Sequence, residues 1–485
     1  MKALAPKFRP RSGFEGSNGY RLLPFRFLRL DATRYVVTNL AGEHLVLPAD
    51  ELHAFIRHRL ARQNPWYLEL ESCHFLYESN PETQAELLAA QYRTRQSALP
   101  HLTALHIFVV TLRCDHSCQY CQVSRVSEDR TAYDMTPATA DRAVDLMFHS
   151  PSPALKIEIQ GGESLLNFPL IRHITQRAKA RAEGRELQFV VATNLSFLTD
   201  EMLDFLAENH FQISTSLDGP AALHNHNRPR PGRDSYERTI AGIKRCRARL
   251  GSDAVSALMT CTAESLHQPE AIVDEYTRQG FREVFLRHLS RYGFAAGAGR
   301  RVGYETEQFL AFYRRALARI LELNRQGVPI REVYASILLR RLLTSNPTGY
   351  VDLQSPTGFG LGVLVYNYDG DVYVSDEGRM LAEMGDRTFR LGNVHHESWE
   401  SLFTGSTWLA TAHALMLEGQ PGCCDCAFQP YCGSDPIFHH STQHSLAGHR
   451  PTSAFCRRNR EILHHLIELM EDDPAAAVIL KRWAQ

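Results

Sequence analysis

The chain has 485 residues, of which 44% are hydrophobic and 22% are charged, so it has the length of about three folded domains with ample apolar core. Lys and Arg number 53 against 54 Asp and Glu, and this balance excludes the strong positive field of a dedicated nucleic-acid-binding protein. No apolar run reaches the ~18 residues of a membrane helix, and none follows the basic residues between Lys2 and Arg11 as a secretory signal requires. We therefore expect a cytoplasmic protein with neither a membrane nor a nucleic-acid partner.

Residues 1–97 are expected to form a small N-terminal α+β module. Short strands are predicted at Phe25–Leu30, Tyr35–Thr38 and His44–Leu47. Pro48 and Asp50 then open a helix. A second helix, predicted over Gln84–Gln96, leads into the next part of the chain.

From residue 98 to 300, strands and helices alternate every ~30–40 residues. Strands rich in Val, Ile, Leu or Phe are predicted at Ala104–Leu112, Leu155–Gln160, Leu187–Thr193, Phe211–Leu217, Val255–Thr262 and Glu283–Leu289. Helical patterns lie between them at Thr136–Phe148, Phe168–Ala182, Asp200–Asn209, Tyr236–Leu250 and Pro269–Gln279. Six such units predict an α/β fold whose parallel sheet curls into a partial (β/α)6 TIM-like barrel, with the chemistry at the C-terminal ends of the strands.

A helical bridge is expected over residues 301–345, followed by a C-terminal domain over residues 346–485. The latter begins with a hairpin in which Asp369 and Gly370 form the tight turn. It then becomes rich in cysteine and ends with a helix predicted over Arg457–Met470.

Three of the eleven cysteines, Cys114, Cys118 and Cys121, directly follow the first barrel strand. Three thiolates in one short loop can converge on a single centre, and a 4Fe-4S cluster normally takes four, so one iron would lack a protein ligand. A structural zinc site would need a fourth ligand, and only His116 lies nearby. The pattern favours a cluster over zinc or inert thiols.

This Cys-x3-Cys-x2-Cys spacing, with Tyr120 before the last cysteine, resembles the signature of the radical S-adenosylmethionine (SAM) enzymes, whose fold is a six-unit partial barrel. The resemblance implies that Cys114, Cys118 and Cys121 bind a 4Fe-4S cluster whose open iron is chelated by SAM. An electron from a flavodoxin- or ferredoxin-like donor would then cleave SAM to methionine and a 5′-deoxyadenosyl radical, which abstracts a hydrogen atom from the substrate.

Polar residues at the ends of the next strands are expected to line the SAM pocket. Gly161-Gly162-Glu163 combines two glycines, which permit close approach of the backbone, with a carboxylate suited to an ammonium group. Thr193-Asn194-Leu195-Ser196 is similar to the Thr-Asn-Gly end of the family's third strand, with Leu195 in place of the glycine. The string around Asp218 resembles the branch that matures peptides and sulfatases, and a plain turn is the alternative for Asp218. The residues carried over from the resemblance are Tyr120, Gly161, Gly162, Glu163, Asn194, Ser196, Ser216, Asp218 and Arg228.

A second cysteine cluster has the spacing Cys423-x2-Cys426-x5-Cys432-x23-Cys456. It is similar to half of the SPASM domain, a C-terminal module that binds auxiliary clusters in radical SAM maturases. Ser375 and Pro436 stand at two positions where the full module has cysteines of its inner cluster. The resemblance implies one auxiliary 4Fe-4S cluster, bound by Cys423, Cys426, Cys432 and Cys456. Two alternatives stay open: zinc in place of the cluster, and Cys424 in place of Cys423.

Asp376, next to Ser375, matches a carboxylate proposed as a general base in related maturases; a solvated aspartate of the hairpin is the alternative. The N-terminal module is similar to the winged-helix-like domains that bind leader peptides in this branch. The edge of its sheet would bind an extended leader through main-chain hydrogen bonds, and the alternative is a cap that only packs on the barrel.

The strings around Cys114, Asn227 and Tyr431 resemble the radical SAM maturases of the His-Xaa-Ser peptide systems. The expected function is therefore the modification of a ribosomally made precursor peptide, by a change such as a side-chain crosslink. One alternative is an anaerobic sulfatase-type maturase that oxidises Cys or Ser in a protein. The other is a non-catalytic protein on the same fold that binds zinc and peptide.

Overall fold

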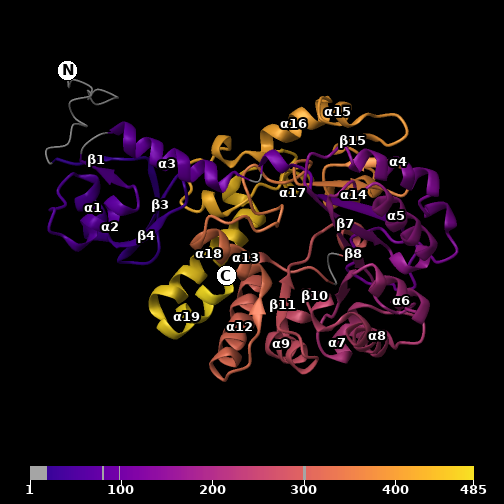
Figure 1. Cartoon of the computed structure of the whole chain (residues 1–485). Coiled ribbons are helices and arrows are strands. Elements are labelled where there is room, and N and C mark those ends of the chain that lie inside the picture. The colour runs from indigo at the N-terminus through magenta and orange to yellow at the C-terminus, as the bar shows by residue number, and fades with distance from the viewer. Residues whose placement is uncertain (1–18, 79–80, 98, 299–301) are drawn as a thin grey trace, which may run out of the picture.

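The computed structural model describes residues 19–78, 81–97, 99–298 and 302–485 (Figure 1). The basic start of the chain and the predicted domain boundaries at residues 98 and 300–301 lie outside the described residues. Within the described part, no helix has both the length and the apolar character needed to cross a bilayer.

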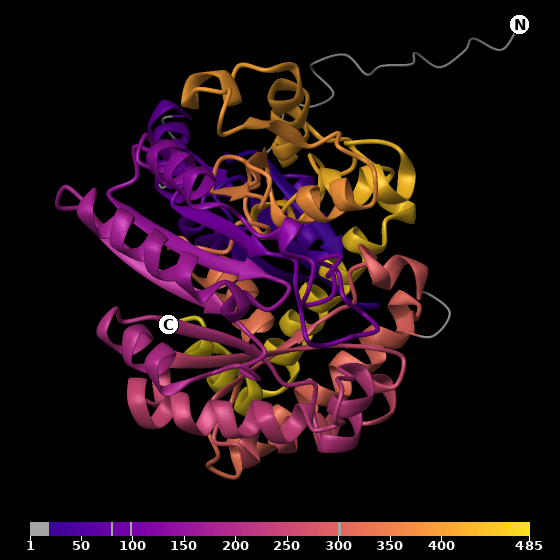
Figure 2. The same cartoon turned by 90° about the vertical axis from the view of Figure 1, so that its right-hand side faces the viewer.

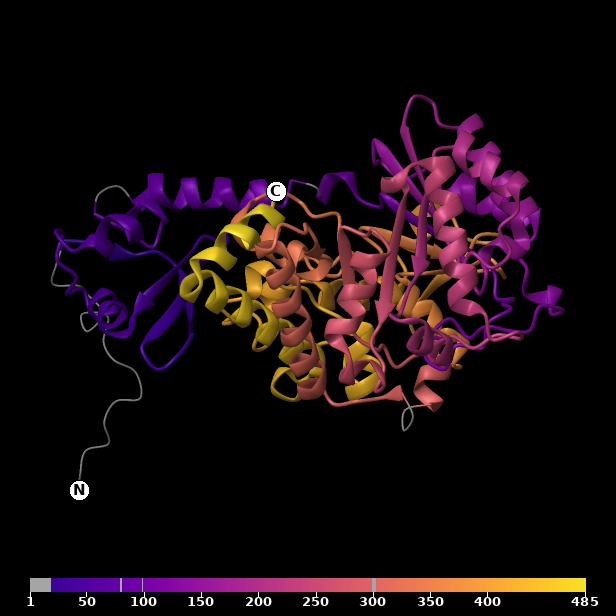
Figure 3. The ribbon, with the colours of Figure 1, turned by 90° about the horizontal axis from the view of Figure 1, so that it is seen from below.

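The N-terminal module contains the predicted three-stranded antiparallel sheet, in the order β2-β3-β4. Its elements are β1 (Arg21–Leu22), β2 (Phe25–Arg29), β3 (Arg34–Asn39), β4 (His44–Pro48), α1 (Ala49–Ile56), α2 (Pro65–Ser72) and β5 (Leu76–Tyr77), followed by α3 (Pro81–Arg95). Val37, Phe55 and Phe75 lie at the centre of a separate small core. The module, coloured indigo, projects at one end of the molecule, and α3 runs from it toward the barrel (Figures 1 and 3).

The predicted parallel sheet is confirmed. Its strands are β6 (Leu105–Thr111), β7 (Ala154–Gly161), β8 (Glu186–Ala192), β9 (Gln212–Ser216), β10 (Val255–Thr260) and β11 (Glu283–Arg287). The helices that connect them are α4 (Pro137–Met147), α5 (Phe168–Ala180), α6 (Asp200–Glu208), α7 (Ala221–Asn227), α8 (Ser235–Leu250) and α9 (Pro269–Arg278). The helices cover the outer face of the curved sheet, which does not close into a full barrel (Figure 2).

Local sequence explains where these helices begin. The side chain of Thr136 accepts a hydrogen bond from the backbone of Thr139 at the start of α4, and Thr199 caps α6 in the same way. These caps satisfy backbone N–H groups that have no partner inside the helix. From the second residue of β6 onward every residue is buried, as expected for a strand covered on both faces.

The sheet continues beyond the predicted barrel on both sides. The predicted hairpin consists of β13 (Val363–Tyr366) and β14 (Asp371–Tyr373), and β13 pairs in parallel with β6. Addition of β15 (Arg390–Asn393) and, at the other end, of β12 (Arg331–Glu332) gives ten strands in one sheet. The expected helical bridge therefore contains a strand of the same sheet besides α12 (Thr306–Arg325) and α13 (Val333–Leu343).

The C-terminal part is mainly helical around the cysteine-rich segment. Its helices are α14 (Asp376–Glu383), α15 (Trp399–Leu402), α16 (Ser406–Leu415), α17 (Pro436–Gln443), α18 (Ala454–Asp472) and α19 (Pro474–Trp483). The predicted terminal helix corresponds to α18, whereas α19, which packs against α13 and α18, was not predicted.

His106 joins the barrel to the hairpin at the centre of the sheet. Its fully buried ring stacks on Tyr366 of β13, and its two nitrogens lie 3.0 Å from the Tyr366 hydroxyl and 2.9 Å from the Thr103 carbonyl. Because a carbonyl only accepts, Nε2 donates to Thr103 and Nδ1 accepts from Tyr366. Burial lowers the pKa of His106 to about 3, so the ring is neutral in the folded protein.

We predict that this histidine makes the protein acid-sensitive. Below the ordinary histidine pKa of ~6.5, His106 binds a proton in the unfolded chain but stays neutral in the folded protein. The free energy of unfolding therefore falls as the pH drops toward the folded pKa, by up to ~1.4 kcal/mol per pH unit. When the pH is lowered from 6.5 to 5, the free energy of unfolding measured with urea should fall by about 2 kcal/mol less in His106→Gln than in the parent. The exposed His413→Gln on α16 should follow the parent. Equal losses in the parent and in His106→Gln would contradict the prediction.

Candidate metal centres

The first cysteine triad lies on the loop that follows β6, at the C-terminal edge of the sheet. The backbone N–H of Cys114 donates to Val126 and that of Cys121 to Cys118, which curls the loop on itself. Burial raises the pKa of the Cys118 thiol to about 11, and the charge of Cys121 adds to this while Arg228 opposes it. Burial and the neighbouring Cys118 also raise the pKa of Cys114. Buried thiols that repel one another when ionised suit a site that a metal centre completes, because its positive charge stabilises the thiolates.

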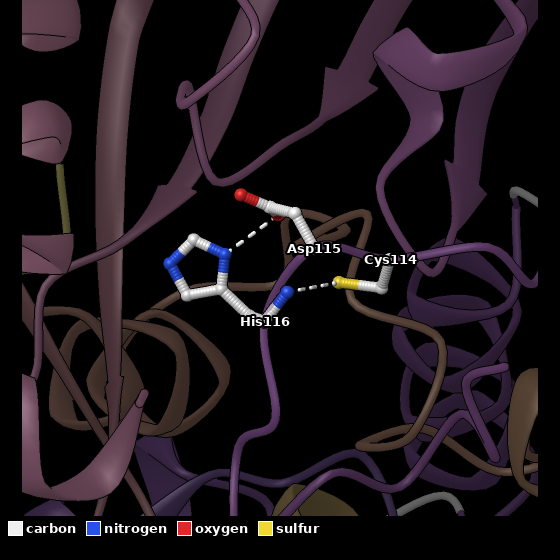
Figure 4. Close-up of side chains that lie close together, drawn as sticks. All are labelled: Cys114, Asp115 and His116. Atoms are coloured by element: carbon white, nitrogen blue, oxygen red, sulfur yellow. Dashed lines mark hydrogen bonds and ion pairs between the residues drawn. The ribbon is translucent and has the colours of Figure 1, made fainter. Parts of the chain in front are cut away.

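Asp115 and His116 hold this loop in place (Figure 4). The His116 Nδ1 lies 2.7 Å from Asp115, and its Nε2 lies 2.8 Å from the Ser235 hydroxyl. Among the described residues, Cys114, Asp115 and His116 are the one group of three or more possible ligands whose atoms lie within 4.8 Å of one another. Since both ring nitrogens already have partners, His116 is not available as a fourth ligand.

Asp115 is also the residue to which two predicted SAM contacts bind. The Asn194 amide donates to Asp115 at 2.8 Å, and the Ser196 hydroxyl donates to it at the same distance. Burial alone would raise the pKa of Asp115, but hydrogen bonds from His116, Ser196 and Asn194 outweigh burial and hold it well below the usual range. In the structure these side chains therefore fix the cysteine loop against the third strand, and SAM contact by Asn194 and Ser196 stays a prediction. An aspartate inside the cysteine motif was the available sequence signal for this role.

Gly161, Gly162 and Glu163 also contact the chain around the cysteine loop. A Cβ on Gly161 would collide with the Thr111 carbonyl, and one on Gly162 with that of Arg113. The Glu163 carboxylate is fully buried, and it accepts hydrogen bonds from the Thr193 hydroxyl at 2.6 Å and from the backbone of Asn194 and Leu165. Burial raises its pKa to about 7, and the hydrogen bonds oppose this. The motif thus joins the ends of β6, β7 and β8.

A buried network of Tyr120, Asp218 and Arg228 lies next to Cys118. The Tyr120 hydroxyl donates to the Asp218 carboxylate at 2.8 Å and accepts from Arg228 at 2.7 Å. Burial would lower the pKa of Arg228, but the charges of Cys118, Tyr120 and Asp218 outweigh it and raise the pKa well above its ordinary value. The structure brings these three predicted residues together beside the triad. Ser216 is the last residue of β9, two positions before Asp218.

We predict that Arg228→Ala destabilises the fold by about 3–5 kcal/mol, because it leaves the carboxylate of Asp218 buried without its cation. Chemical denaturation of the protein before metal loading measures this separately from any effect on a cluster. Arg282→Ala, at an exposed position before β11, should stay within ~0.5 kcal/mol of the parent. A similar small change for Arg228→Ala would show that the network contributes little to folding.

The second set of cysteines also converges. The charges of Cys423, Cys426 and Cys456 all add to burial in raising the pKa of Cys432 to about 12. Cys424 is not part of this group; its backbone carbonyl accepts a hydrogen bond from Arg26, and its thiol lies 3.6 Å from Asp425. The geometry therefore favours Cys423 over Cys424 as the ligand.

The spacing of these four thiols favours a cluster over zinc. Tetrahedral zinc with Zn–S bonds of ~2.3 Å holds its sulfurs within about 4 Å of one another. Among the described residues, however, no three cysteine sulfurs lie within 4.8 Å of one another. A cubane, in which each cysteine binds a different iron, keeps the sulfurs farther apart.

We predict that Cys423→Ala lowers the bound iron of the anaerobically reconstituted protein, whereas Cys424→Ala does not. The pair of neighbouring substitutions controls for the loss of a thiol from the same loop. Iron, sulfide and zinc are counted in each protein. Loss of iron in Cys424→Ala but not in Cys423→Ala would make Cys424 the ligand instead. Stoichiometric zinc without auxiliary iron in the parent would show that the site binds zinc rather than a cluster.

Asp376 lies on the side of the C-terminal part that faces the first triad. Its carboxylate accepts a hydrogen bond from the buried Arg379 at 3.0 Å, and Arg379 also donates to the Val123 carbonyl at 3.1 Å. Val123 follows Cys121 by two residues, so Arg379 places Asp376 near the cysteine loop. Arg379 could not be selected from the sequence, because an arginine on an amphipathic helix is usually exposed.

Residues 108–286 match the family model described as the radical SAM superfamily. A serine-type anaerobic sulfatase-maturating enzyme from Bacteroides thetaiotaomicron is 26% identical over 152 residues, which are 30% of this chain and 37% of that protein. An uncharacterized protein from Methanothermobacter thermautotrophicus is 27% identical over 179 residues, 36% of this chain and 65% of that protein. The matches thus cover less than two thirds of the length of these relatives.

Two solved structures extend the likeness beyond the barrel. AdoMet-bound anSMEcpe has a TM-score of 0.61 at 16% identity and covers 78% of this chain and 99% of its own. Streptococcus suis SuiB bound to its precursor peptide SuiA has a TM-score of 0.54 at 14% identity and covers 89% of this chain and 98% of its own. At these identities the similarity shows a shared fold.

Proposed function

Because the chain contains a radical SAM domain, we propose that it is a radical SAM enzyme that modifies a ribosomally made precursor peptide. The observation that carries the proposal is the position of Cys114, Cys118 and Cys121: three partly buried thiols on one loop at the C-terminal end of β6. A 4Fe-4S cluster bound there, together with SAM, would supply a 5′-deoxyadenosyl radical that removes a hydrogen atom from the peptide.

The residues around this loop would orient the cofactor and exclude water. Asp115 and His116 hold the loop against Asn194 and Ser235, so the thiols do not have to be ordered when the cluster binds. The positive charge of Arg228 next to Cys118 would favour the thiolate. Asp376 would act as the general base that takes a proton from the substrate, since Arg379 holds it near the loop.

The second site would hold an auxiliary 4Fe-4S cluster on Cys423, Cys426, Cys432 and Cys456. With four protein ligands it would have no iron open to substrate, so its roles would be electron transfer and support of the fold. The electron that starts the reaction would come from a flavodoxin- or ferredoxin-like donor.

A peptide substrate is favoured over a sulfatase by the larger share of the chain that the likeness to SuiB covers. The likeness to anSMEcpe covers 78% of the chain and that to SuiB covers 89%. The sheet of the module has two edge strands, β2 and β4, that pair with no further strand of the described chain, and such an edge can bind an extended leader by β-augmentation. Precursor peptides of the His-Xaa-Ser type are the proposed substrates, and a side-chain crosslink is the proposed product.

The sulfatase-type alternative has its own support in the relative from Bacteroides thetaiotaomicron. It predicts oxidation of a Cys or Ser side chain in a peptide that carries no leader. The two candidates therefore differ in the effect of removing residues 1–97. The peptide maturase should lose modification of its substrate while SAM cleavage continues, whereas the sulfatase-type enzyme should keep both.

We predict about eight irons per chain after anaerobic reconstitution, which should fall to about four in the Cys114→Ala/Cys118→Ala/Cys121→Ala variant. With dithionite as reductant, the parent should form 5′-deoxyadenosine and this variant should form none. Cys246→Ala, which removes a fully buried thiol of α8, should retain both iron and SAM cleavage. A protein that binds zinc instead of iron and leaves SAM intact would sink the enzyme proposal in favour of a non-catalytic binding protein.

A further inference from the structure

A cavity of about 60 Å³ lies at the C-terminal end of β11, between the sheet and the C-terminal helices. A cavity needs only ~10–15 Å³ on this measure to hold one water, so it has room for the end of a side chain. Three carboxylates line it from separate parts of the chain: Asp352 from the segment before β13, Glu377 from the first turn of α14, and Asp435 from the residue before α17.

These carboxylates face one another without a close cation. Burial raises the pKa of Asp352 and of Asp435 to about 7, and in both cases the charge of Glu377 adds to the effect. Arg287 and Arg458 line the same cavity and oppose these rises in pKa, Arg287 at Asp352 and Arg458 at Asp435. Within the described chain, none of the three carboxylates has a Lys or Arg nitrogen within the 4.0 Å of an ion pair. Each has at least one oxygen left for a further partner: Glu377 accepts from Ser375, and Asp435 accepts from the backbone of its own helix.

Tyr292 gives an independent indication of a missing partner. It is only 3% exposed and lines the cavity, and its hydroxyl makes no hydrogen bond of normal geometry to the described residues. Burial raises the pKa of Tyr292, and the charges of Asp435, Glu377 and Asp352, which line the same cavity, add to the effect. A buried polar atom without a partner is costly. A phenol oxygen also accepts hydrogen bonds, so a cationic donor, or a water held beside it, would be stabilised here.

The size of the site argues against a bare Mg²⁺ or Zn²⁺ ion. Mg²⁺ and Zn²⁺ bind oxygen at ~2.0–2.2 Å and would draw their ligands within about 4.4 Å of one another. The carboxylate oxygens of Asp352, Glu377 and Asp435 do not meet even a 4.8 Å limit. A larger, hydrogen-bonding organic cation fits acidic groups spaced in this way.

The cavity lies between the two cysteine sites. On one side, Tyr292 is two residues before Phe294, whose backbone donates to the Cys121 carbonyl at 2.9 Å. On the other side, Tyr334 lines the cavity and donates to Asn459, whose amide lies 3.7 Å from the Cys432 sulfur. A neighbouring cavity of about 380 Å³ shares four lining residues with it and offers an approach from outside: His288, Phe309, Phe438 and Arg458.

We propose that the cavity bounded by Tyr292, Asp352, Glu377 and Asp435 receives a positively charged side chain of the peptide substrate and thereby positions the neighbouring residue beside the first cysteine loop. The inference rests on the proposed function, because it assigns a substrate subsite to that enzyme. It adds the chemical class of the side chain that the site selects: lysine, arginine or protonated histidine.

The test compares peptides that differ only in charge. N-acetylated, C-amidated tripeptides Ser-X-Ser, with X as lysine, arginine or neutral norleucine, are titrated at pH 8, where Asp352 and Asp435 are ionised, into the anaerobically reconstituted full chain with SAM; the histidine peptide is compared at pH 8 and at pH 6. Binding is followed by broadening of the peptide NMR signals. We expect the lysine peptide to bind about tenfold tighter than the norleucine peptide, as for a charge-assisted hydrogen bond in a partly buried site.

Two variants locate the preference. Glu377→Gln/Asp435→Asn should bring the lysine-to-norleucine ratio to about one, whereas Glu383→Gln, on the same helix but hydrogen-bonded to Asn367, should keep it. Circular dichroism and iron counts establish that each variant is folded. If the double variant is not, each single variant should lower the ratio about threefold, half of the double effect on a logarithmic scale.

Three results would overturn the proposal: no preference for charge in the parent, a preference that survives in the double variant, and no binding by any cationic tripeptide. The same preparations are assayed for 5′-deoxyadenosine without peptide. Loss of SAM cleavage with the charge preference intact would sink the proposed enzyme and leave the cation site, so the two failures are distinguishable.

Discussion

Strand β6 is the constraint on which the rest of the structure depends, because it is paired on both edges and carries the first cysteine loop at its end. It pairs with β7 of the barrel on one side and with β13 of the C-terminal part on the other. The loop therefore begins from the middle of a ten-stranded sheet. Any shift of the C-terminal part relative to the barrel would have to break the register between β6 and β13, so the two cysteine sites are held on one continuous framework.

Around that strand, buried charges are compensated in two different ways. Asp115 is saturated by neighbouring donors and stays ionised, which makes the cysteine loop rigid before any cofactor binds. At Asp352, Glu377 and Asp435 burial outweighs the fewer donors present, and their proton affinity rises instead. A group that is fully paired inside the protein stabilises the fold, whereas one left with spare acceptors is prepared for an outside partner. The difference separates the structural carboxylate from the candidate binding groups.

Much of the fold was predictable, because its signals are local. The six buried strands of the barrel are short apolar runs between caps and turns, and the predicted bounds agree with the observed ones to within about two residues. The pairing of β13 with β6 was not predictable, since nothing within the hairpin specifies a partner more than 200 residues away. Likewise Cys114, Cys118 and Cys121 were selected by their spacing, but the partners of Asp115 depend on which strand ends meet. Arg379 and the three cavity carboxylates carry no motif at all.

The N-terminal module illustrates how such long-range contacts bear on function. Arg26 of β2 donates to the Cys424 carbonyl and Thr38 of β3 donates to the Ala427 carbonyl, so the module docks on the segment that carries the auxiliary cysteines. A leader bound at the edge of this sheet would enter close to Cys423 and Cys426 and would have to pass the auxiliary site before its following residues reached the first triad. The cavity lies between Cys432 and Cys121, so a charged side chain captured there would fix the register of the peptide close to the first triad.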